Sequence, residues 1–320
     1  MKIFEKKKEL LNSINKASQI YIVAHKNMDL DAINSCIAFS YYLKTLNKES
    51  TIIIDDIKHE SGVKKVLEDY SSMYKAVKSK DVSNTDESLL IILDTNKQGL
   101  VQNSELVDQF INIINIDHHD YKTSSIKKGL SIIDENSSST CEMLTEFFEK
   151  EKLELNSKVS NLLLGGIVLD TNYFQLKTTK ESFYYSYYLM NKGASMEYVN
   201  TLLKQNLDDY VKRLKIIASV KKRKGIAISR GKRNNIYNKE ELAKAADILL
   251  TFKNIKASFV IGRISKDEIG ISARSMGGIK VGKIMEKLGG GGDEFEAATV
   301  IKSQKIDEVV SSLNKIIKDI

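Results

Sequence analysis

The stretch Ile113-Ile114-Asn115-Ile116-Asp117-His118-His119 predicts how the N-terminal part of the chain folds. A short apolar run that stops abruptly at polar groups is typical of a buried strand ending at the edge of a sheet. In open α/β sheets, the carboxyl ends of the strands carry the binding sites. The carboxylate and the two imidazoles here are oxygen and nitrogen ligands that suit a borderline metal ion. The stretch therefore predicts a parallel sheet with a metal site at its edge.

Other segments also place an aspartate where an apolar element stops. They are His25 to Asp31 after residues 20–23, Asp94 to Asn96 after residues 88–93, and Asp170 with Thr171 after residues 161–169. A single aspartate in such a place is most often a helix cap or a turn residue. A single histidine such as His25 is most often a hydrogen-bonded core residue. The coincidence of four such placements nevertheless favours a metal site.

The chemistry of these groups indicates a reaction class. If the strand ends converge, the aspartates would crowd one pocket, and their repulsion would raise their pKa values and destabilise the fold. Divalent cations remove this conflict. Aspartates mixed with imidazoles suit Mn²⁺ better than Ca²⁺, which prefers oxygen ligands alone, or structural Zn²⁺, which prefers thiolates. Two such ions about 4 Å apart can activate water and neutralise charge during phosphoester hydrolysis.

Composition restricts the class of protein. A chain of 320 residues is long for one core, so we expect two domains. Its longest apolar runs fall far short of the roughly 20 residues that span a bilayer, and the N-terminus lacks the apolar segment of a signal peptide. We therefore expect a cytoplasmic protein with no membrane attachment and with reduced, structural Cys36 and Cys141. The net charge of +7 favours anionic partners. The basic run 221–224 and His59 are expected to face solvent, and contact with nucleic acid stays an alternative for the basic run.

The order of elements predicts an α/β organisation. Strands and helices alternate in the first half, as a parallel sheet requires. The expected strands cover residues 20–23, 50–54, 88–93 and 111–116, and the expected helices cover residues 31–43, 64–70 and 140–149. Residues 161–169 fit either a strand or a helix by periodicity alone. We expect a catalytic domain over residues 1–190, a helical linker over 191–215, and a second domain over 216–320.

These motifs resemble those of the DHH phosphoesterase superfamily, which is named for the tripeptide at 117–119. The order is His25-x-x-x-Asp29-x-Asp31, then Leu93-Asp94-Thr95, then Asp117-His118-His119, then Asp170-Thr171-x-x-Phe174. The likeness continues through the DHH-associated C-terminal domain of that superfamily. It implies a parallel-sheet DHH domain and a smaller α/β DHH-associated domain, with the active-site cleft between them.

The resemblance also implies roles for individual residues. One Mn²⁺ would be bound by His25 and Asp29, the other by Asp31, His118 and Asp170, and both by a bridging Asp94. Other divalent metals stay open. Asp117 would orient His118 without binding metal, and His119 would be a catalytic group facing the scissile phosphate. The segment Ser137-Ser138-Ser139-Thr140 resembles a family stretch that opens a helix; we expect an N-cap there, and amides that meet a phosphate stay an alternative.

In the second domain, residues 271–277 and the glycine run 289–292 resemble the substrate-binding element of bacterial cyclic-di-AMP phosphodiesterases. The implied substrate-binding residues are Ser272, Arg274, Gly290, Gly291, Gly292 and Asp293. Arg274 is expected to make bidentate contacts to a phosphate, with a surface salt bridge as the alternative. Asp293 stands where the family has a histidine, and a carboxylate repels phosphate unless it is protonated or paired.

The implied activity is Mn²⁺-dependent hydrolysis of cyclic di-AMP to pApA by two-metal hydroxide attack, and further cleavage to AMP stays open. One alternative is an oligoribonuclease (nanoRNase) that acts on short RNA and removes phosphate from 3′-phosphoadenosine 5′-phosphate (pAp). A second alternative, motivated by Asp293, is a catalytically weak nucleotide-binding sensor. The expected partners are cyclic di-AMP or short adenine-containing oligonucleotides, and a homodimer stays open.

Overall fold

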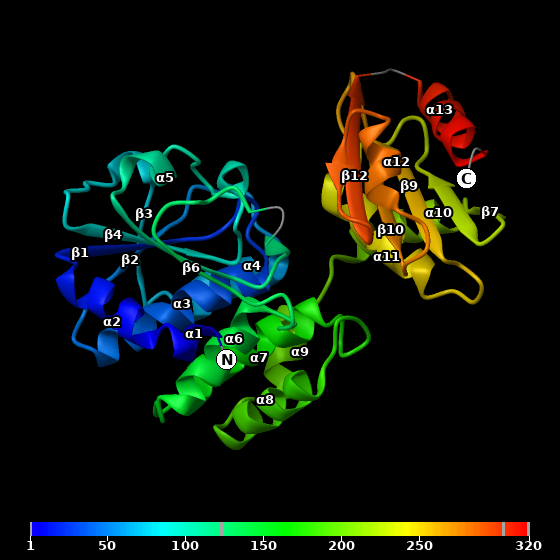
Figure 1. The fold of residues 1–320 in the computed structure, drawn as a ribbon. Helices are drawn as coiled ribbons and strands as arrows, with labels where there is room; N and C mark the ends of the chain where they lie inside the picture. The colour runs from blue at the N-terminus through cyan, green and yellow to red at the C-terminus, as the bar shows by residue number, and fades with distance from the viewer. Residues whose placement is uncertain (1, 122–123, 303–304, 319–320) are drawn as a thin grey trace. The chain divides into compact units, whose positions relative to one another are not determined.

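A computed structural model describes residues 2–121, 124–302 and 305–318 (Figure 1). The chain divides after Lys204 into two compact units, residues 1–204 and residues 205–320. Each unit is built on its own sheet, and strands and helices are mixed in both. This confirms the expected α/β fold class.

The first unit contains a sheet in which every neighbouring pair of described strands is parallel, in the order β3-β2-β1-β4-β5-β6. The strands are β1 (Gln19–Val23), β2 (Thr51–Ile53), β3 (Lys75–Val77), β4 (Ser88–Leu93), β5 (Asn112–Asp117) and β6 (Leu130–Ile133). The helices are α1 (Lys2–Glu5), α2 (Lys7–Lys16), α3 (Leu30–Thr45), α4 (Ser61–Asp69), α5 (Leu106–Gln109), α6 (Thr140–Lys150), α7 (Ser157–Asp170), α8 (Lys180–Asn191) and α9 (Met196–Leu202). Short 3₁₀ turns are η1 (Ser79–Asp81) and η2 (Gln98–Leu100).

The central strands are apolar because both of their faces are covered. All of β4 is buried; Leu89, Ile91 and Leu93 pack into the core that contains α3, α6 and α7, whereas Leu90 and Ile92 pack toward α5 on the other face. Figure 1 shows α3 and α5 on opposite sides of this sheet. Continuous apolar runs of this kind are typical of strands in parallel sheets.

The ambiguous segment 161–169 is helical. It lies within α7, whose N-cap Asn156 accepts a hydrogen bond from the Val159 amide at 3.0 Å. The helix is apolar on most sides because it packs against both α3 and α6. A helix buried on several faces lacks the one-sided periodicity that identifies an amphipathic helix, and this explains why its sequence resembled a strand equally well.

The second unit has a mixed sheet in the order β11-β12-β10-β9-β8-β7, in which β8 and β9 are parallel and the other described pairs are antiparallel. The strands are β7 (Lys221–Arg223), β8 (Ile226–Arg230), β9 (Ala257–Arg263), β10 (Glu268–Ser275), β11 (Gly291–Gly292) and β12 (Glu296–Lys302). The helices are α10 (Leu207–Ile217), α11 (Lys239–Leu250), α12 (Val281–Glu286) and α13 (Ile306–Lys318). The basic strand β7 is exposed along its length, as expected.

The segment expected as a linker, residues 191–215, contributes to both units. Helix α9 packs against α4 and α7 in the first unit, whereas α10 packs against α11 and β8 in the second. None of the helices in the described ranges has both the length and the apolar composition that a bilayer-spanning helix needs.

Candidate metal centre

The sheet order brings the predicted site residues to one edge. The chain runs outward from β1 through β2 and β3 and then returns to place β4 on the other side of β1. Connections diverge at such a reversal and leave a crevice beyond the carboxyl ends of the strands, where ligands bind in open α/β sheets. His25 follows β1, Asp94 follows β4, and Asp117 is the last residue of β5.

Two helix ends complete this edge. Asp29 is the N-cap of α3, where its Oδ1 accepts the Ala32 amide at 3.0 Å, and Asp31 lies in the first turn of the same helix. Asp170 is the last residue of α7. Helix ends and strand ends from distant parts of the sequence therefore supply the expected ligands.

The expected ligands form two groups, considering only the described residues. Besides a group made of Asp94, Asp117, His118 and His119, two groups hold the expected ligands, and the ligand atoms of each lie within 4.8 Å of one another. His25, Asp29 and Asp94 form one of the two, and Asp31, His118 and Asp170 form the other. Asp94 faces both groups, because its Oδ2 is 3.4 Å from His25 Nε2 and its Oδ1 is 3.4 Å from His118 Nε2. This is the position that a carboxylate shared by two cations would occupy.

Asp94 is held there by an unusual backbone conformation. Its φ of 60° lies in the left-handed region, which costs a non-glycine residue free energy unless the surroundings hold it. The Asp94 amide donates to the Ile116 carbonyl at 3.0 Å, and the Thr140 hydroxyl donates to Asp94 Oδ1 at 3.0 Å. Behind this turn, the side-chain amide Nδ2 of the fully buried Asn115 donates to the Thr95 carbonyl at 2.6 Å.

Asp31 is held by the N-terminus of α6. Its two carboxylate oxygens accept the amides of Thr140 at 2.7 Å and Cys141 at 2.9 Å, where the helix dipole favours negative charge. The N-cap is Ser139, whose hydroxyl accepts the Glu142 amide, as expected for this segment. The amides of Thr140 and Cys141 therefore bind a carboxylate and not a phosphate.

The electrostatics of the cluster fit a cation. Burial alone would lower the His118 pKa, but Asp170 and Asp94 raise it well above its usual value. Burial raises the Asp31 pKa well above its usual value, and the negative charges of Asp94 and Asp170 add to this effect. His118 Nε2 is buried with no hydrogen-bond partner among the described residues, yet it lies 3.2 Å from Asp170 Oδ2. Buried carboxylates and an unpaired imidazole nitrogen around one point are a donor set that a divalent metal satisfies.

Asp117 contacts a different histidine from the expected one. Its Oδ1 lies 2.7 Å from His119 Nδ1, whereas we expected it to orient His118. The rings of His118 and His119 lie side by side, with centroids 4.3 Å apart, and Asp117 pairs with His119; the orienting role of Asp117 toward His118 stays a prediction. Since Asp117 is fully buried and His119 is half exposed, the carboxylate fixes a ring whose Nε2 is left for the cavity.

A cavity of about 370 Å³ lies over the cluster. The residues that line it include His25, Asp29, Asp94, His118, His119 and Asp170, together with Lys26, Lys97 and Lys177. The sequence reasoning missed the lysines, although Lys97 follows Asp94-Thr95-Asn96 directly.

His59 is only partly exposed, so its expected surface position is correct in part. Cys36 and Cys141 are buried free thiols, as expected.

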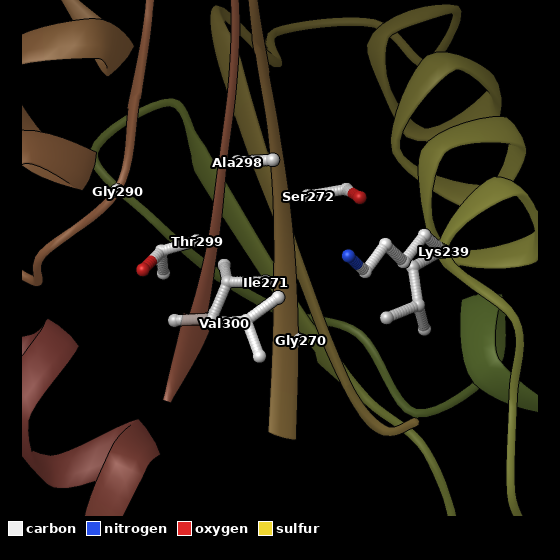
Figure 2. Close-up of a pocket in the computed structure, with 9 residues that line it drawn as sticks. Lys239, Gly270, Ile271, Ser272, Gly290, Ala298, Thr299 and Val300 are labelled. Atoms are coloured by element: carbon white, nitrogen blue, oxygen red, sulfur yellow. The ribbon is translucent and has the colours of Figure 1, made fainter. Parts of the chain in front are cut away.

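In the second unit, a smaller cavity of about 270 Å³ is lined by two of the expected residues, Ser272 and Gly290. Figure 2 shows the Lys239 side chain reaching from α11 toward the strand that carries Ser272. Lys239 was not predicted, because the residue after an N-cap gives no sequence signal for binding. A side chain at Gly290 would collide with the Ala298 carbonyl at 2.2 Å, so this close approach of backbones requires glycine.

Two of the expected substrate-binding residues, Arg274 and Asp293, are engaged within the chain. Arg274 Nε donates to Asp247 Oδ1 at 2.7 Å, and Arg274 Nη2 lies 3.7 Å from Glu296 Oε2, which is the salt-bridge alternative. Asp293 Oδ1 accepts the amides of Phe295 and Glu296, both at 2.7 Å, so its carboxylate caps the turn before β12. Arg274, Gly291, Gly292 and Asp293 are not among the described residues that line this cavity.

Comparison with known proteins identifies both parts of the chain. The model of the DHH family N-terminal domain matches residues 19–167, and the model of the DHHA1 domain matches residues 183–319. The cyclic-di-AMP phosphodiesterase GdpP of Geobacillus thermodenitrificans is 32% identical over 96% of this chain, which spans about half (48%) of that relative.

Two further proteins match over most of their own length. The bifunctional oligoribonuclease and PAP phosphatase NrnA of Thermus thermophilus is 25% identical and covers 98% of this chain and 94% of its own. An exopolyphosphatase-related protein from Bacteroides fragilis has the same fold, with a TM-score of 0.80 at 17% identity over 99% of this chain and 96% of its own. The chain therefore contains a DHH family N-terminal domain followed by a DHHA1 domain.

Proposed function

We propose that this chain is a manganese-dependent phosphodiesterase that hydrolyses cyclic di-AMP to pApA, with further cleavage to AMP as an open step. The observation that carries the proposal is Asp94, which presents one oxygen to each of two ligand groups. GdpP, a cyclic-di-AMP phosphodiesterase, supports the choice of substrate. The proposal places the reaction in the cavity of about 370 Å³ over the cluster.

The proposed ligands are His25 and Asp29 for one ion, Asp31, His118 and Asp170 for the other, and Asp94 for both. Bound there, two Mn²⁺ ions would supply an activated water and would neutralise charge on the phosphate. In this proposal Asp94 and the amide-bound Asp31 keep the ligands fixed before substrate arrives. Polar groups that are already in position stabilise a transition state without the free-energy cost of reorienting them during the reaction.

His119 acts on the substrate. Because Asp117 occupies its Nδ1 at 2.7 Å, the ring offers Nε2 to the cavity that it lines. We assign that atom to the scissile phosphate, where it donates a hydrogen bond or a proton to the leaving oxygen. Asp117 is thus a positioning residue for His119.

The second unit supplies nucleotide-binding groups in this proposal. Ser272 and Gly290 line its cavity, and Lys239 adds a positive charge. In this proposal Arg274 binds a phosphate, and its hydrogen bond to Asp247 must break when the ligand binds. Gly291, Gly292 and Asp293 form the adjoining turn.

The test is hydrolysis of cyclic di-AMP by the full chain with Mn²⁺, followed by separation of pApA and AMP. Asp94→Ala should abolish turnover, because both ligand groups lose a shared oxygen. Asp81→Ala, which removes an exposed carboxylate from η1, is the matched control and should retain wild-type activity. Wild-type turnover by Asp94→Ala in the presence of Mn²⁺ would refute the two-metal assignment.

A second candidate is an oligoribonuclease that also removes phosphate from pAp. It is favoured by the similarity to NrnA, a bifunctional oligoribonuclease and PAP phosphatase that is 25% identical over 98% of this chain. Rates on cyclic di-AMP, pApA and pAp, measured side by side at equal Mn²⁺, decide between the two. A kcat/KM for pAp that exceeds that for cyclic di-AMP would favour the second candidate.

A further inference from the structure

Positive side chains share the cavity with the ligand cluster. Among the described residues, Lys26, Lys97 and Lys177 line it together with Asp29, Asp94 and Asp170. The proposed metal ligands and His119 account for the acidic and imidazole groups of this wall. That assignment gives the lysines no role. Charged side chains usually lie in solvent, so their place in a cavity wall calls for an explanation.

Lys26 and Lys97 are fixed to the segments that carry the ligands. The Lys26 amide donates to the Leu100 carbonyl at 2.7 Å, and its Nζ donates to the Gly99 carbonyl at 2.9 Å. The Lys97 amide donates to the Thr95 hydroxyl at 3.3 Å, one residue beyond Asp94. Backbone pairing between His25 and Val101 joins the two segments. The Lys26 ammonium and the backbone of Lys97 therefore keep a fixed place relative to the proposed ligands.

Neither lysine is neutralised by a carboxylate. In the described ranges, no salt bridge involves Lys26 or Lys97; the Lys26 ammonium instead contacts a carbonyl oxygen. An ammonium that contacts only neutral groups retains donors and charge for an anion. Both side chains also remain partly or fully accessible to solvent, so an anion can reach them.

The charge balance indicates which anion they would bind. Two divalent cations would neutralise the carboxylates of Asp29, Asp31, Asp94 and Asp170, while metal-bound histidines are neutral. The lysine charges would then remain as an excess on the wall. If the substrate had a single phosphodiester, held by the metals and His119, the positive charge of the lysines would have no anionic partner. A second phosphate nearby in the substrate would supply that partner.

Building on the proposed function, we propose that Lys97 and Lys26 bind a second phosphate of the substrate, the one that is not cleaved. The ligand class is a nucleotide with two phosphate groups close together, such as a dinucleotide or a nucleoside bisphosphate. In this role the lysines determine specificity for the substrate and take no part in the cleavage step. An ammonium donates to phosphate as a point charge, and hydrogen bonds to charged groups are among the stronger ones.

The experiment compares two substrates at saturating Mn²⁺: pApA, which has a second phosphate, and bis(p-nitrophenyl) phosphate, which has only the scissile one. Lys97→Met should raise KM for pApA about tenfold with kcat within twofold, since hydrogen bonds to charged groups have about this effect. KM for bis(p-nitrophenyl) phosphate should not change. Lys26→Met should act in the same direction. Lys80→Met, which removes an exposed charge from η1, is the control for net charge.

Additional measurements separate phosphate binding from structural effects. Lys97→Arg should restore most of the KM for pApA, because the positive charge is kept, and Mn²⁺ affinity measured by calorimetry should be unchanged in Lys97→Met. An equal change of KM for both substrates, or no change for either, would overturn the assignment. Failure of the wild-type chain to cleave either substrate would instead refute the proposed function.

Discussion

Gly166 in α7 offers a sharp test of how the metal cluster is packed. A Cβ atom at this position would lie 2.4 Å from Cys141 Sγ and 2.5 Å from Asp31 Oδ1. Replacement by alanine adds up to about 1 kcal/mol of helix propensity, but overpacking a core costs about 1–3 kcal/mol. Because Asp31 is fully buried and tied to two amides, it has little room to move. We expect Gly166→Ala to lower the free energy of unfolding by about 1–2 kcal/mol.

The same substitution should also weaken metal binding. The new methyl group displaces the Asp31 carboxylate, and disturbing the groups that position a ligand typically costs about 10–100-fold in metal affinity. The assays are urea unfolding with a chelator present and calorimetric titration with Mn²⁺. Gly165→Ala is the matched control, because its Cβ would lie 3.0 Å from Asn34 Nδ2 and contacts no ligand. Equal Mn²⁺ affinity in both variants would refute this account of the packing.

The remaining predictions concern His119, pH and Asp293. Asp117→Asn should lower kcat about 10–100-fold while Mn²⁺ affinity is kept, since only the His119 ring loses its charged partner; a parallel loss of Mn²⁺ binding would contradict this role. Asp29 and Asp94 hold the His25 pKa well above its usual value despite burial, and the His118 pKa is raised likewise. A histidine with a raised pKa stabilises the fold while it is protonated, so the Tm of chelated protein should fall as pH rises above about 6.5; a rising Tm would contradict this sign. Asp293→Asn keeps the turn acceptor but removes the charge, so it should tighten cyclic di-AMP binding with an unchanged Tm, and weaker binding would show that the carboxylate does not repel the ligand.

The sequence was sufficient for the parallel sheet and for the convergence of the ligands. Buried strands can be identified from continuous apolar runs such as residues 88–93. The carboxyl ends of neighbouring parallel strands lie at the same edge of the sheet. The convergence of Asp94, His118 and the other expected ligands could therefore be predicted without any knowledge of side-chain positions. The helical state of residues 161–169 was not predictable, because packing on several faces removes the helical period.

Contacts between distant side chains were not predictable. The pairing of Asp117 with His119 depends on side-chain rotamers at the strand end, and the spacing of residues in the sequence does not determine these rotamers. Arg274 pairs with Asp247 only because β10 packs against α11. The local role of Asp293 follows from a turn whose amides point back at its carboxylate, a pattern visible only once the backbone is known.

The central claim is that two divalent ions share Asp94, and metal stoichiometry tests it most directly. The measurement is equilibrium dialysis of the chelator-treated chain against Mn²⁺, followed by elemental analysis, with Asp94→Ala beside the wild type. The account predicts two bound ions per wild-type chain and a loss of affinity at both sites in the variant. One ion or none per wild-type chain, or a variant that still binds two with wild-type affinity, would contradict it.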